Sequence, residues 1–249
     1  TTDSDSTDTS DSTSTSAKAL KAGSEVNISG GEFKIDSADD SVHSNGNIVI
    51  TGGNISAASG DDGMHANGNL TISEGTIDIT KSYEGIEGSI VTIDGGTISV
   101  VSSDDGINCA GGSDTGSTDR MGADQFSAQE GVELNINGGT VTIDADGDGL
   151  DSNGNFTMAG GTVYVCGPTN GGNGALDYNG TATVTGGTLI ACGAVGMEEG
   201  FGDTSTQYSV LHDLGSTVSA NEKLTITDSD GKEILSFTPT KTWQSVVFT

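Results

Sequence analysis

The sequence predicts an all-β fold: a right-handed parallel β-helix whose coils each contain about 22 residues. An acidic turn recurs along the chain, and a Gly-Gly or Glu-Gly step precedes most copies of it. The second residues of these steps are Gly31, Gly53, Gly75, Gly96, Gly139, Gly161 and Gly187, at spacings of 22, 22, 21, 43, 22 and 26 residues. Between the steps, apolar and polar residues alternate with a period of two, as in strands with one buried face. A fixed period of this length is typical of a solenoid.

Each coil is expected to contain three short strands that turn at glycine-containing corners. The first full coil would bury Val42, Ile48, Ile50 and Ile55, and later coils repeat these apolar positions. A single coil cannot bury its own apolar face, so neighbouring coils must cover it. We expect one partial opening coil, six full coils and a partial closing coil.

Three segments follow from this pattern. Residues 1–16 are entirely Thr, Ser and Asp and are expected to be a solvated tether. Residues 17–204 form the β-helix, with a loop insertion at about 111–131, and residues 205–249 form C-terminal strands that cover its end. In this tail, the turn Asp228-Ser229-Asp230-Gly231 predicts a hairpin. Trp243 is interpreted as part of the core of this cap.

Composition limits the function. The net charge of −28 excludes nucleic acid and an anionic membrane as direct partners, because the chain has no basic patch. No apolar run is long enough for a transmembrane segment, and a monomer is expected. Cys166 and Cys192 occupy the same slot in adjacent coils, where either a disulfide or a pair of buried thiols is compatible with the strand spacing.

Carboxylates that are one period apart should stack into columns. The first column contains Asp40, Asp62, Glu84, Asp105 and Asp148, and Asp39, Asp61 and Asp104 form a column beside it. A further column, three residues later, contains His43, His65, Glu87, Asn108, Asp151 and Asp177. Like charges at a strand spacing of ~4.8 Å repel, and either proton uptake or a divalent cation would relieve the repulsion. Oxygen ligands favour Ca²⁺.

The calcium ligands are therefore predicted among thirteen residues: Asp39, Asp40, Asp61, Asp62, Glu84, Glu87, Asp104, Asp105, Asn108, Asp146, Asp148, Asp151 and Asp177. The run from Asp144 to Gly149 matches the opening of a calcium loop but lacks its final Glu, so it is not an EF-hand. The alternative is a solvated acidic face. His43 and His65 are interpreted as a surface pair, and the Asn45, Asn67, Asn153 and Asn179 column as structural.

The segments Asp61-Asp62-Gly63-Met64, Gly68-Asn69-Leu70-Thr71-Ile72 and Gly95-Gly96-Thr97-Ile98 resemble a bacterial carbohydrate-binding β-helix family typified by clostridial surface proteins. The insertion with Arg120, Met121 and Phe126 and the terminal strands agree with this family in order, so the resemblance covers roughly residues 17–249. It implies a pectate-lyase-like fold, bound Ca²⁺, and binding to plant cell-wall polysaccharides such as polygalacturonate and cellulose. It also implies an extracellular location at the bacterial cell surface.

A non-catalytic binding protein is the preferred interpretation, with an acidic or neutral polysaccharide as partner. Contacts to sugar are assigned to Tyr83, Arg120, Phe126, Tyr164 and Tyr178, for which local packing is the alternative. A calcium-dependent pectate lyase would need a basic residue beside the metal, and Lys81 and Arg120 are the candidates. A glycosidase would need one tuned carboxylate pair, which a uniform ladder does not favour. A purely structural or ice-binding solenoid is a third class.

Overall fold

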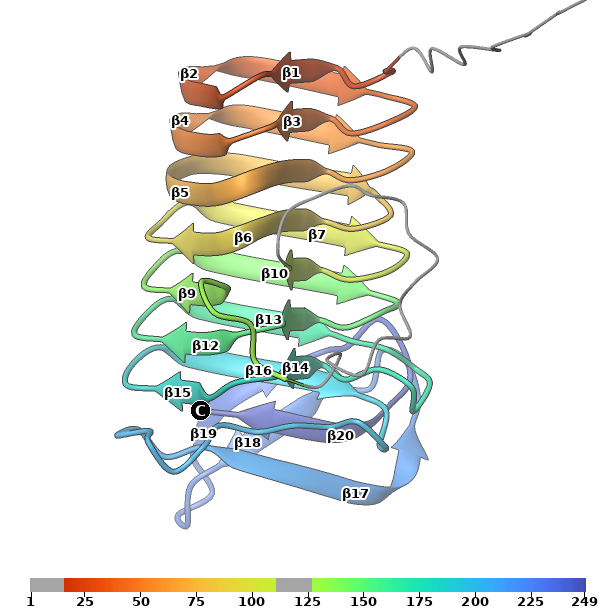
Figure 1. Ribbon diagram of the computed structural model, residues 1–249. Helices are drawn as coiled ribbons and strands as arrows, with labels where there is room; N and C mark the ends of the chain where they lie inside the picture. Colours follow the sequence, from red (N-terminus) through yellow and green to blue (C-terminus); the bar gives the residue numbers. More distant parts are fainter. Residues whose placement is uncertain (1–15, 111–126) are drawn as a thin grey trace, which may run out of the picture.

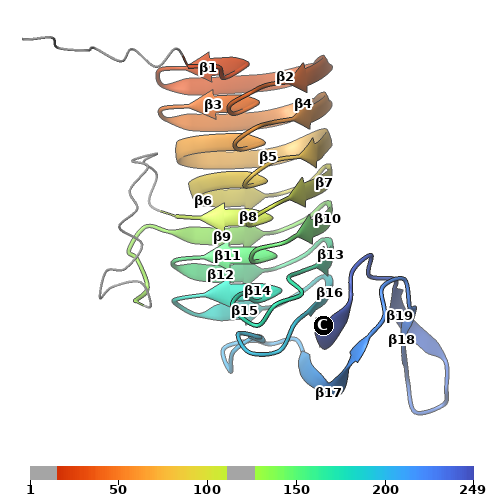
Figure 2. The same cartoon turned by 90° about the vertical axis from the view of Figure 1, so that its right-hand side faces the viewer.

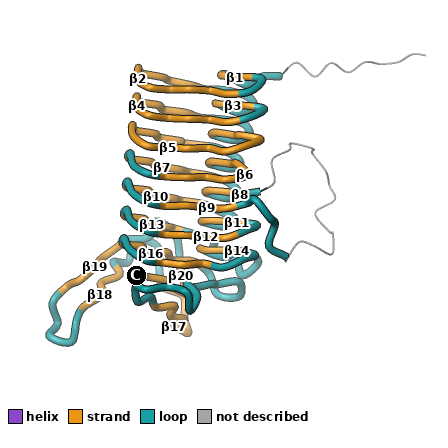
Figure 3. Tube along the Cα trace, turned by 60° about the vertical axis from the view of Figure 1, so that its left-hand side comes forward, coloured by secondary structure: helices purple, strands orange, loops and turns teal. Residues whose placement is uncertain are grey.

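The computed structural model describes residues 16–110 and 127–249, and it has the stacked coils that the repeat predicts. Figure 1 shows about seven coils, one above the other, from the N-terminal end to the C-terminal strands. Figure 3 shows that strands lie along the sides of the stack while turns and loops form its corners. The described residues contain no helix long and apolar enough to span a bilayer. The predicted tether at 1–16, apart from Ser16, and most of the insertion at 111–131 lie outside the described residues.

The strands form three parallel faces, one for each side of a coil (Figure 1). Short strands of the first face are β1 (Leu20–Ala22), β3 (Val42–Ser44), β8 (Ile107–Cys109), β11 (Leu150–Ser152) and β14 (Leu176–Tyr178). The second face includes β9 (Glu133–Ile136), β12 (Asn155–Met158) and β15 (Ala182–Val184). The third includes β7 (Thr97–Ser102), β10 (Thr140–Ala145), β13 (Thr162–Cys166) and β16 (Thr188–Gly193). Longer strands run over more than one face: β2 (Glu25–Asp36), β4 (Asn47–Ala58), β5 (Met64–Lys81) and β6 (Ile86–Ile93).

Adjacent coils pair in register, so equivalent residues stack. Along the first face, Val42 pairs with Met64, which pairs with Ile86. The same row continues through Ile107, Leu150 and Leu176. The members of this row are buried, and together with the apolar rows of the other two faces they form one continuous core. The predicted coil period and the predicted apolar columns are therefore confirmed.

The Gly-Gly steps lie at the corner before the third face. Gly139 has a φ of 81°, which L side chains rarely adopt, and a Cβ there would come within 2.9 Å of the backbone of Gly95 in the preceding coil. The positive φ recurs at every corner of this type, and the close backbone contact recurs at all of them except Gly31 of the first coil, which explains why the step recurs with the period of the coil.

Antiparallel strands close the C-terminal end of the stack. β20 (Trp243–Phe248) pairs with β16 on one side and with β17 (Val210–Val218) on the other. The predicted hairpin is present as β18 (Leu224–Thr227) and β19 (Glu233–Phe237), and Figure 2 shows it beside the end of the stack. Trp243 is only 4% exposed and belongs to a second apolar cluster, so its assignment to the cap core is confirmed.

Cys166 and Cys192 are register partners on β13 and β16, as the sequence predicted. Both are buried free thiols in this structure. Cys192 belongs to the same apolar cluster as Trp243. This pair lies beneath the cap, on the third face of the coils.

Candidate functional site

Two columns of polar side chains run along the first face and form the candidate site. The first column occupies the turn before each first-face strand: Asp40, Asp62, Glu84, Asp105 and Asp148. The second column occupies the middle of those strands: His43, His65, Glu87, Asn108, Asp151 and Asp177. Strand pairing places each member of the second column directly beside the next. The sequence predicted both columns.

A regular hydrogen-bond pattern fixes the orientation of the first column. The backbone amide of Asp62 donates to Asp40 Oδ1 at 3.3 Å, and the amide of Glu84 donates to Asp62 Oδ1 at 3.2 Å. Further along, the amide of Asp148 donates to Asp105 Oδ1 at 2.7 Å. One oxygen of each of these carboxylates therefore binds the next coil. The other oxygen is left to interact with side chains or with an ion.

This pattern distinguishes the two neighbouring acidic columns. Asp40, Asp62 and Glu84 are 0%, 4% and 5% exposed, so the first column faces inward in these three coils, whereas Asp105 and Asp148 are half-buried. Asp39, Asp61 and Asp104 are only half-buried. The sequence pattern alone left this choice open, because a shift of one residue reverses the direction of a side chain.

The upper half of the columns, toward the N-terminal end, contains basic groups among its carboxylates. We define it as Lys18, Asp39, Asp40, His43, Asp62, His65 and Glu87. Lys18 Nζ lies 2.9 Å from Asp39 Oδ1 and also contacts Asp40 Oδ2. Although burial opposes it, hydrogen bonds from Lys18 and from backbone amides hold the pKa of Asp39 at about 2. Sequence analysis missed Lys18, which occupies the position 22 residues before Asp40 and so extends the first column.

The histidines of the upper half are buried, so their interpretation as a surface pair is wrong. His43 is 4% exposed and His65 is 0% exposed, and their ring centroids lie 5.0 Å apart. His43 Nδ1 lies 2.7 Å from Asp40 Oδ2, and His65 Nδ1 lies 3.1 Å from Asp62 Oδ2. The repeated three-residue spacing from acid to histidine was the sequence signal for these pairs.

The lower half contains Glu84, Asp105, Asn108, Asp148, Asp151 and Asp177. Burial, together with neighbouring carboxylates, raises the pKa of Glu84 to about 8, of Asp105 to about 8 and of Asp148 to about 7. Burial also raises the pKa of Asp177. The carboxylates that raise these pKa values include Asp62 and Glu87 around Glu84, and Asp104 and Asp148 around Asp105.

Three carboxylates of the lower half converge. Asp105, Asp148 and Asp151 each place an oxygen within 4.8 Å of the other two. Beside them on the second column, Asn108 Nδ2 donates to Glu84 Oε2 at 2.9 Å. Asn108 Oδ1 is buried and has no hydrogen-bond partner among the described residues. Carboxylate and amide oxygens are the ligand types that a hard cation prefers, and an orphaned buried acceptor calls for a partner that the described residues do not supply.

Other predicted ligands lie apart from this cluster. Asp146 is exposed, and Lys241 Nζ lies 3.2 Å from its Oδ1 and 2.9 Å from Asp144 Oδ1. The run from Asp144 to Gly149 is therefore divided, because Asp148 belongs to the first column while Asp144 and Asp146 contact Lys241 of the C-terminal segment. Glu199, which sequence analysis missed, lies outside the repeat and adds to the charge that raises the pKa of Asp148.

The described aromatic candidates for sugar contact differ in exposure. Tyr83 is 43% exposed on the turn beside Glu84. Tyr164 points outward but stacks on Phe237 of the hairpin, at a centroid distance of 5.5 Å. Tyr178 is half-buried, and its hydroxyl donates to the carbonyl of Gly200. Arg120 and Phe126 lie outside the described residues. Among the described aromatic candidates, Tyr83 therefore has the most exposed side chain.

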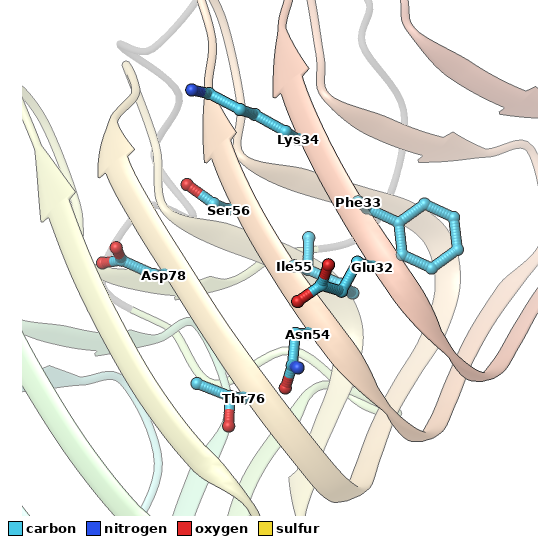
Figure 4. Close-up of a pocket in the computed structure, with 8 residues that line it drawn as sticks. All are labelled: Glu32, Phe33, Lys34, Asn54, Ile55, Ser56, Thr76 and Asp78. Carbon is cyan, nitrogen blue, oxygen red and sulfur yellow. The ribbon is translucent and has the colours of Figure 1, made fainter.

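A shallow groove of about 480 Å³ lies on the third face of the upper coils. Figure 4 shows two outward rows in it: Glu32, Asn54 and Thr76 form one, and Lys34, Ser56 and Asp78 form the other. All six side chains can exchange hydrogen bonds with hydroxyl groups. This groove lies on a different face from the acidic columns.

A parallel β-helix that carries an acidic face and a polar groove belongs to a class whose extended surfaces suit polymeric ligands. A family described as carbohydrate-binding domain-containing protein matches residues 1–63 and 64–174, which is well over half of the chain. The chain belongs to this family. No curated protein and no solved structure matches it at a significant level.

Proposed function

We propose that this protein binds acidic plant cell-wall polysaccharide, such as polygalacturonate, without cleaving it, through Ca²⁺ held by the lower half of the columns. Membership in the carbohydrate-binding family supports a polysaccharide as ligand. The observation that carries the calcium proposal is the convergence of Asp105, Asp148 and Asp151 beside the orphaned Asn108 Oδ1. The resemblance to clostridial surface proteins supports a location outside a bacterial cell.

The charge of the chain explains why a cation is needed. At a net charge of −28, the protein repels a polyuronate. Asp148 and Asp105 are half-buried carboxylates with pKa values of about 7 and about 8, and they resist ionisation near neutral pH unless positive charge lies beside them. Bound Ca²⁺ would supply that charge and would offer open coordination positions to uronate carboxylates. Asp105, Asp148, Asp151 and Asn108 would hold it through oxygen atoms alone.

The groove on the third face supports a second ligand class, a neutral glucan such as cellulose. Its outward rows combine hydroxyl, amide, carboxylate and ammonium groups from three coils, which suits hydrogen bonding to a chain of sugar hydroxyls (Figure 4). Binding at this groove would not require a metal. The two faces can therefore be separated by experiment.

The test measures retention of the full chain on polygalacturonate and on cellulose, with Ca²⁺ and with EDTA. We expect calcium-dependent retention on polygalacturonate that the double variant D105N/D148N loses. A matched control, D203N/D230N, also removes two charges but at exposed positions away from the columns, and it should be retained. Retention on polygalacturonate that is equal in EDTA would contradict the calcium proposal.

A calcium-dependent lyase is the alternative that the same assay addresses. Lys81 is exposed at the end of β5, three residues before Glu84, and Arg120 lies outside the described residues. A lyase would release unsaturated products that absorb ultraviolet light when pectate and Ca²⁺ are present. We expect retention with no such product. If wild type gives a product signal and K81M abolishes it, the function is catalysis and not binding alone.

A further inference from the structure

The upper half of the columns has a donor set that differs in kind from the oxygen-only lower half. His65 and Glu87 are register partners on adjacent coils, and His65 Nδ1 lies 2.7 Å from Glu87 Oε2. The same nitrogen lies 3.1 Å from Asp62 Oδ2. One imidazole nitrogen is thus held between carboxylate oxygens from two consecutive coils.

A second group adjoins the first. Asp40, His43 and His65 each place one ligand atom within 4.8 Å of the others, and Asp62, His65 and Glu87 do the same. His65 belongs to both groups. The two imidazole rings face each other at 5.0 Å, with an angle of 34° between their planes. Two histidines and three carboxylates therefore surround one small buried volume.

The geometry is close to that of a four-coordinate metal. Zinc bonds nitrogen and oxygen at about 2.0–2.2 Å, so its ligand atoms lie about 3.3 Å from one another in a tetrahedral site. The observed separations of 2.7 Å and 3.1 Å around His65 Nδ1 need only a small expansion to reach this value. Imidazole with carboxylate suits zinc and its first-row neighbours, whereas Ca²⁺ prefers oxygen ligands alone.

We propose that His65, Asp62 and Glu87 bind a divalent transition-metal ion such as Zn²⁺, with Asp40 and His43 of the preceding coil beside it. On binding, the ion takes the place of the proton between the imidazole nitrogen and the carboxylates, and this proton passes to solvent. Because its ligands come from two coils, the ion would connect those coils. The site is separate from the calcium site proposed above and does not depend on the polysaccharide.

Burial supports this assignment. Asp40 is 0% exposed, Asp62 4% and His65 0%, so charge in this volume must be balanced locally. Lys18 approaches this group from the Asp40 side, where it contacts Asp39 and Asp40. At the Glu87 side, a divalent ion would balance Asp62 and Glu87 together. Protonation of both histidines is the competing way to balance the same charges.

The experiment titrates the EDTA-treated, dialysed full chain with Co²⁺ in the presence of excess Ca²⁺. We expect visible absorbance bands of a low-coordinate Co²⁺ site, saturating at one equivalent and removed by Zn²⁺. E87Q should weaken Co²⁺ binding by more than about tenfold, and H65N should abolish the bands. Thermal melts without metal establish whether each variant is folded. If H65N does not fold, E87Q still tests the proposal.

The control separates the two metal sites. D105N/D148N alters only the lower half, so it should keep the Co²⁺ bands even where it loses calcium-dependent retention. The absence of such bands in the wild-type chain would overturn the proposal. So would nitrogen NMR spectra in which His65 keeps both ring protons in the presence of excess Zn²⁺, because that result assigns the charge balance to an imidazolium.

Discussion

The upper and lower halves of the columns share one backbone arrangement but balance their charge in opposite ways. In the upper half, Lys18, His43 and His65 lie within hydrogen-bonding distance of carboxylates. In the lower half, the members that converge are carboxylates, with Asn108 beside them. The same repeated turn therefore supports carboxylates paired with basic groups at one end and a cluster of converging carboxylates at the other.

The difference also appears in the pKa values. In the upper half the pKa of Asp39 falls to about 2, whereas in the lower half burial raises those of Glu84 and Asp105 to about 8. Asp62 lies between these cases, since burial raises its pKa to about 6 while His65 opposes that rise. A solenoid can thus vary the chemistry of a column by one substitution per coil without altering its strands.

Removing the positive charge of Lys18 from the upper half should have the largest effect on the free energy of unfolding. K18M leaves Asp40, which is fully buried, without its lysine, and breaking a buried ion pair costs about 3–5 kcal/mol. Urea unfolding measures this loss. As a control, K223M removes an ion pair to Glu233 in which both side chains are about half exposed, and its cost should be much smaller because solvent screens the pair. Equal losses in the two variants would contradict the comparison.

Adding a cation to the lower half should have the next largest effect. Ca²⁺ at a hundredfold excess over its Kd should stabilise the folded chain by about 2.7 kcal/mol through mass action. Thermal melts with Ca²⁺ and with EDTA measure this shift. The variant D105N/D148N should melt at the same temperature in both conditions, whereas D203N/D230N should respond as the wild type does. A wild-type melt that Ca²⁺ leaves unchanged would show that the lower half is not a calcium site.

The repeat made the fold predictable, and the same repeat limited what could be predicted of the site. Period-two alternation and stacking fix which apolar residues are buried, so the row from Val42 to Leu176 followed from the sequence. The choice between Asp61 and Asp62 did not, because it depends on a hydrogen bond from the backbone of the next coil. The C-terminal strands lie outside the repeat, so the pairing of β20 with β16 had no periodic signal.

Two features of the site could have been predicted by extending the columns. Lys18 lies one period before Asp40, and its position at the end of the first column follows from counting. The burial of His43 and His65 was missed because histidine has an intermediate burial preference, so the residue type alone does not indicate whether it is buried. Their shared spacing of three residues from Asp40 and Asp62 indicated a side-chain pair, which is what the structure contains.

The residue after each first-column carboxylate also distinguishes the first coil from the later coils. Gly63, Gly85, Gly106 and Gly149 occupy this position, whereas the first coil has Ser41. A Cβ on Gly106 would lie 2.3 Å from Ile143 Cγ2, but the corresponding row has Ala57 in the coil of Ser41. G106S should therefore cost about 1–3 kcal/mol by overpacking, and S41G should cost less. Urea unfolding compares the two, and an equal cost would show that the glycine is not required by packing.

The pH dependence of stability should have opposite signs for Asp39 of the upper half and for Glu84 and Asp105 of the lower half. Asp39 has a lowered pKa, so its contribution is present above its ordinary pKa and is lost as the pH falls through about 2. Glu84 and Asp105 have raised pKa values, so their contribution is present below their ordinary pKa values and is lost as the pH rises through about 8.

Without metal, stability should therefore decline as the pH rises from about 4 to about 8, by at most about 1.4 kcal/mol per pH unit for each titrating carboxylate. Urea unfolding of the EDTA-treated chain at several pH values measures this slope. D105N/D148N should flatten the slope, because the amides do not titrate, and saturating Ca²⁺ should flatten it in the wild type. A slope that both treatments leave intact would place the titrating groups elsewhere and would remove the electrostatic difference between the two halves.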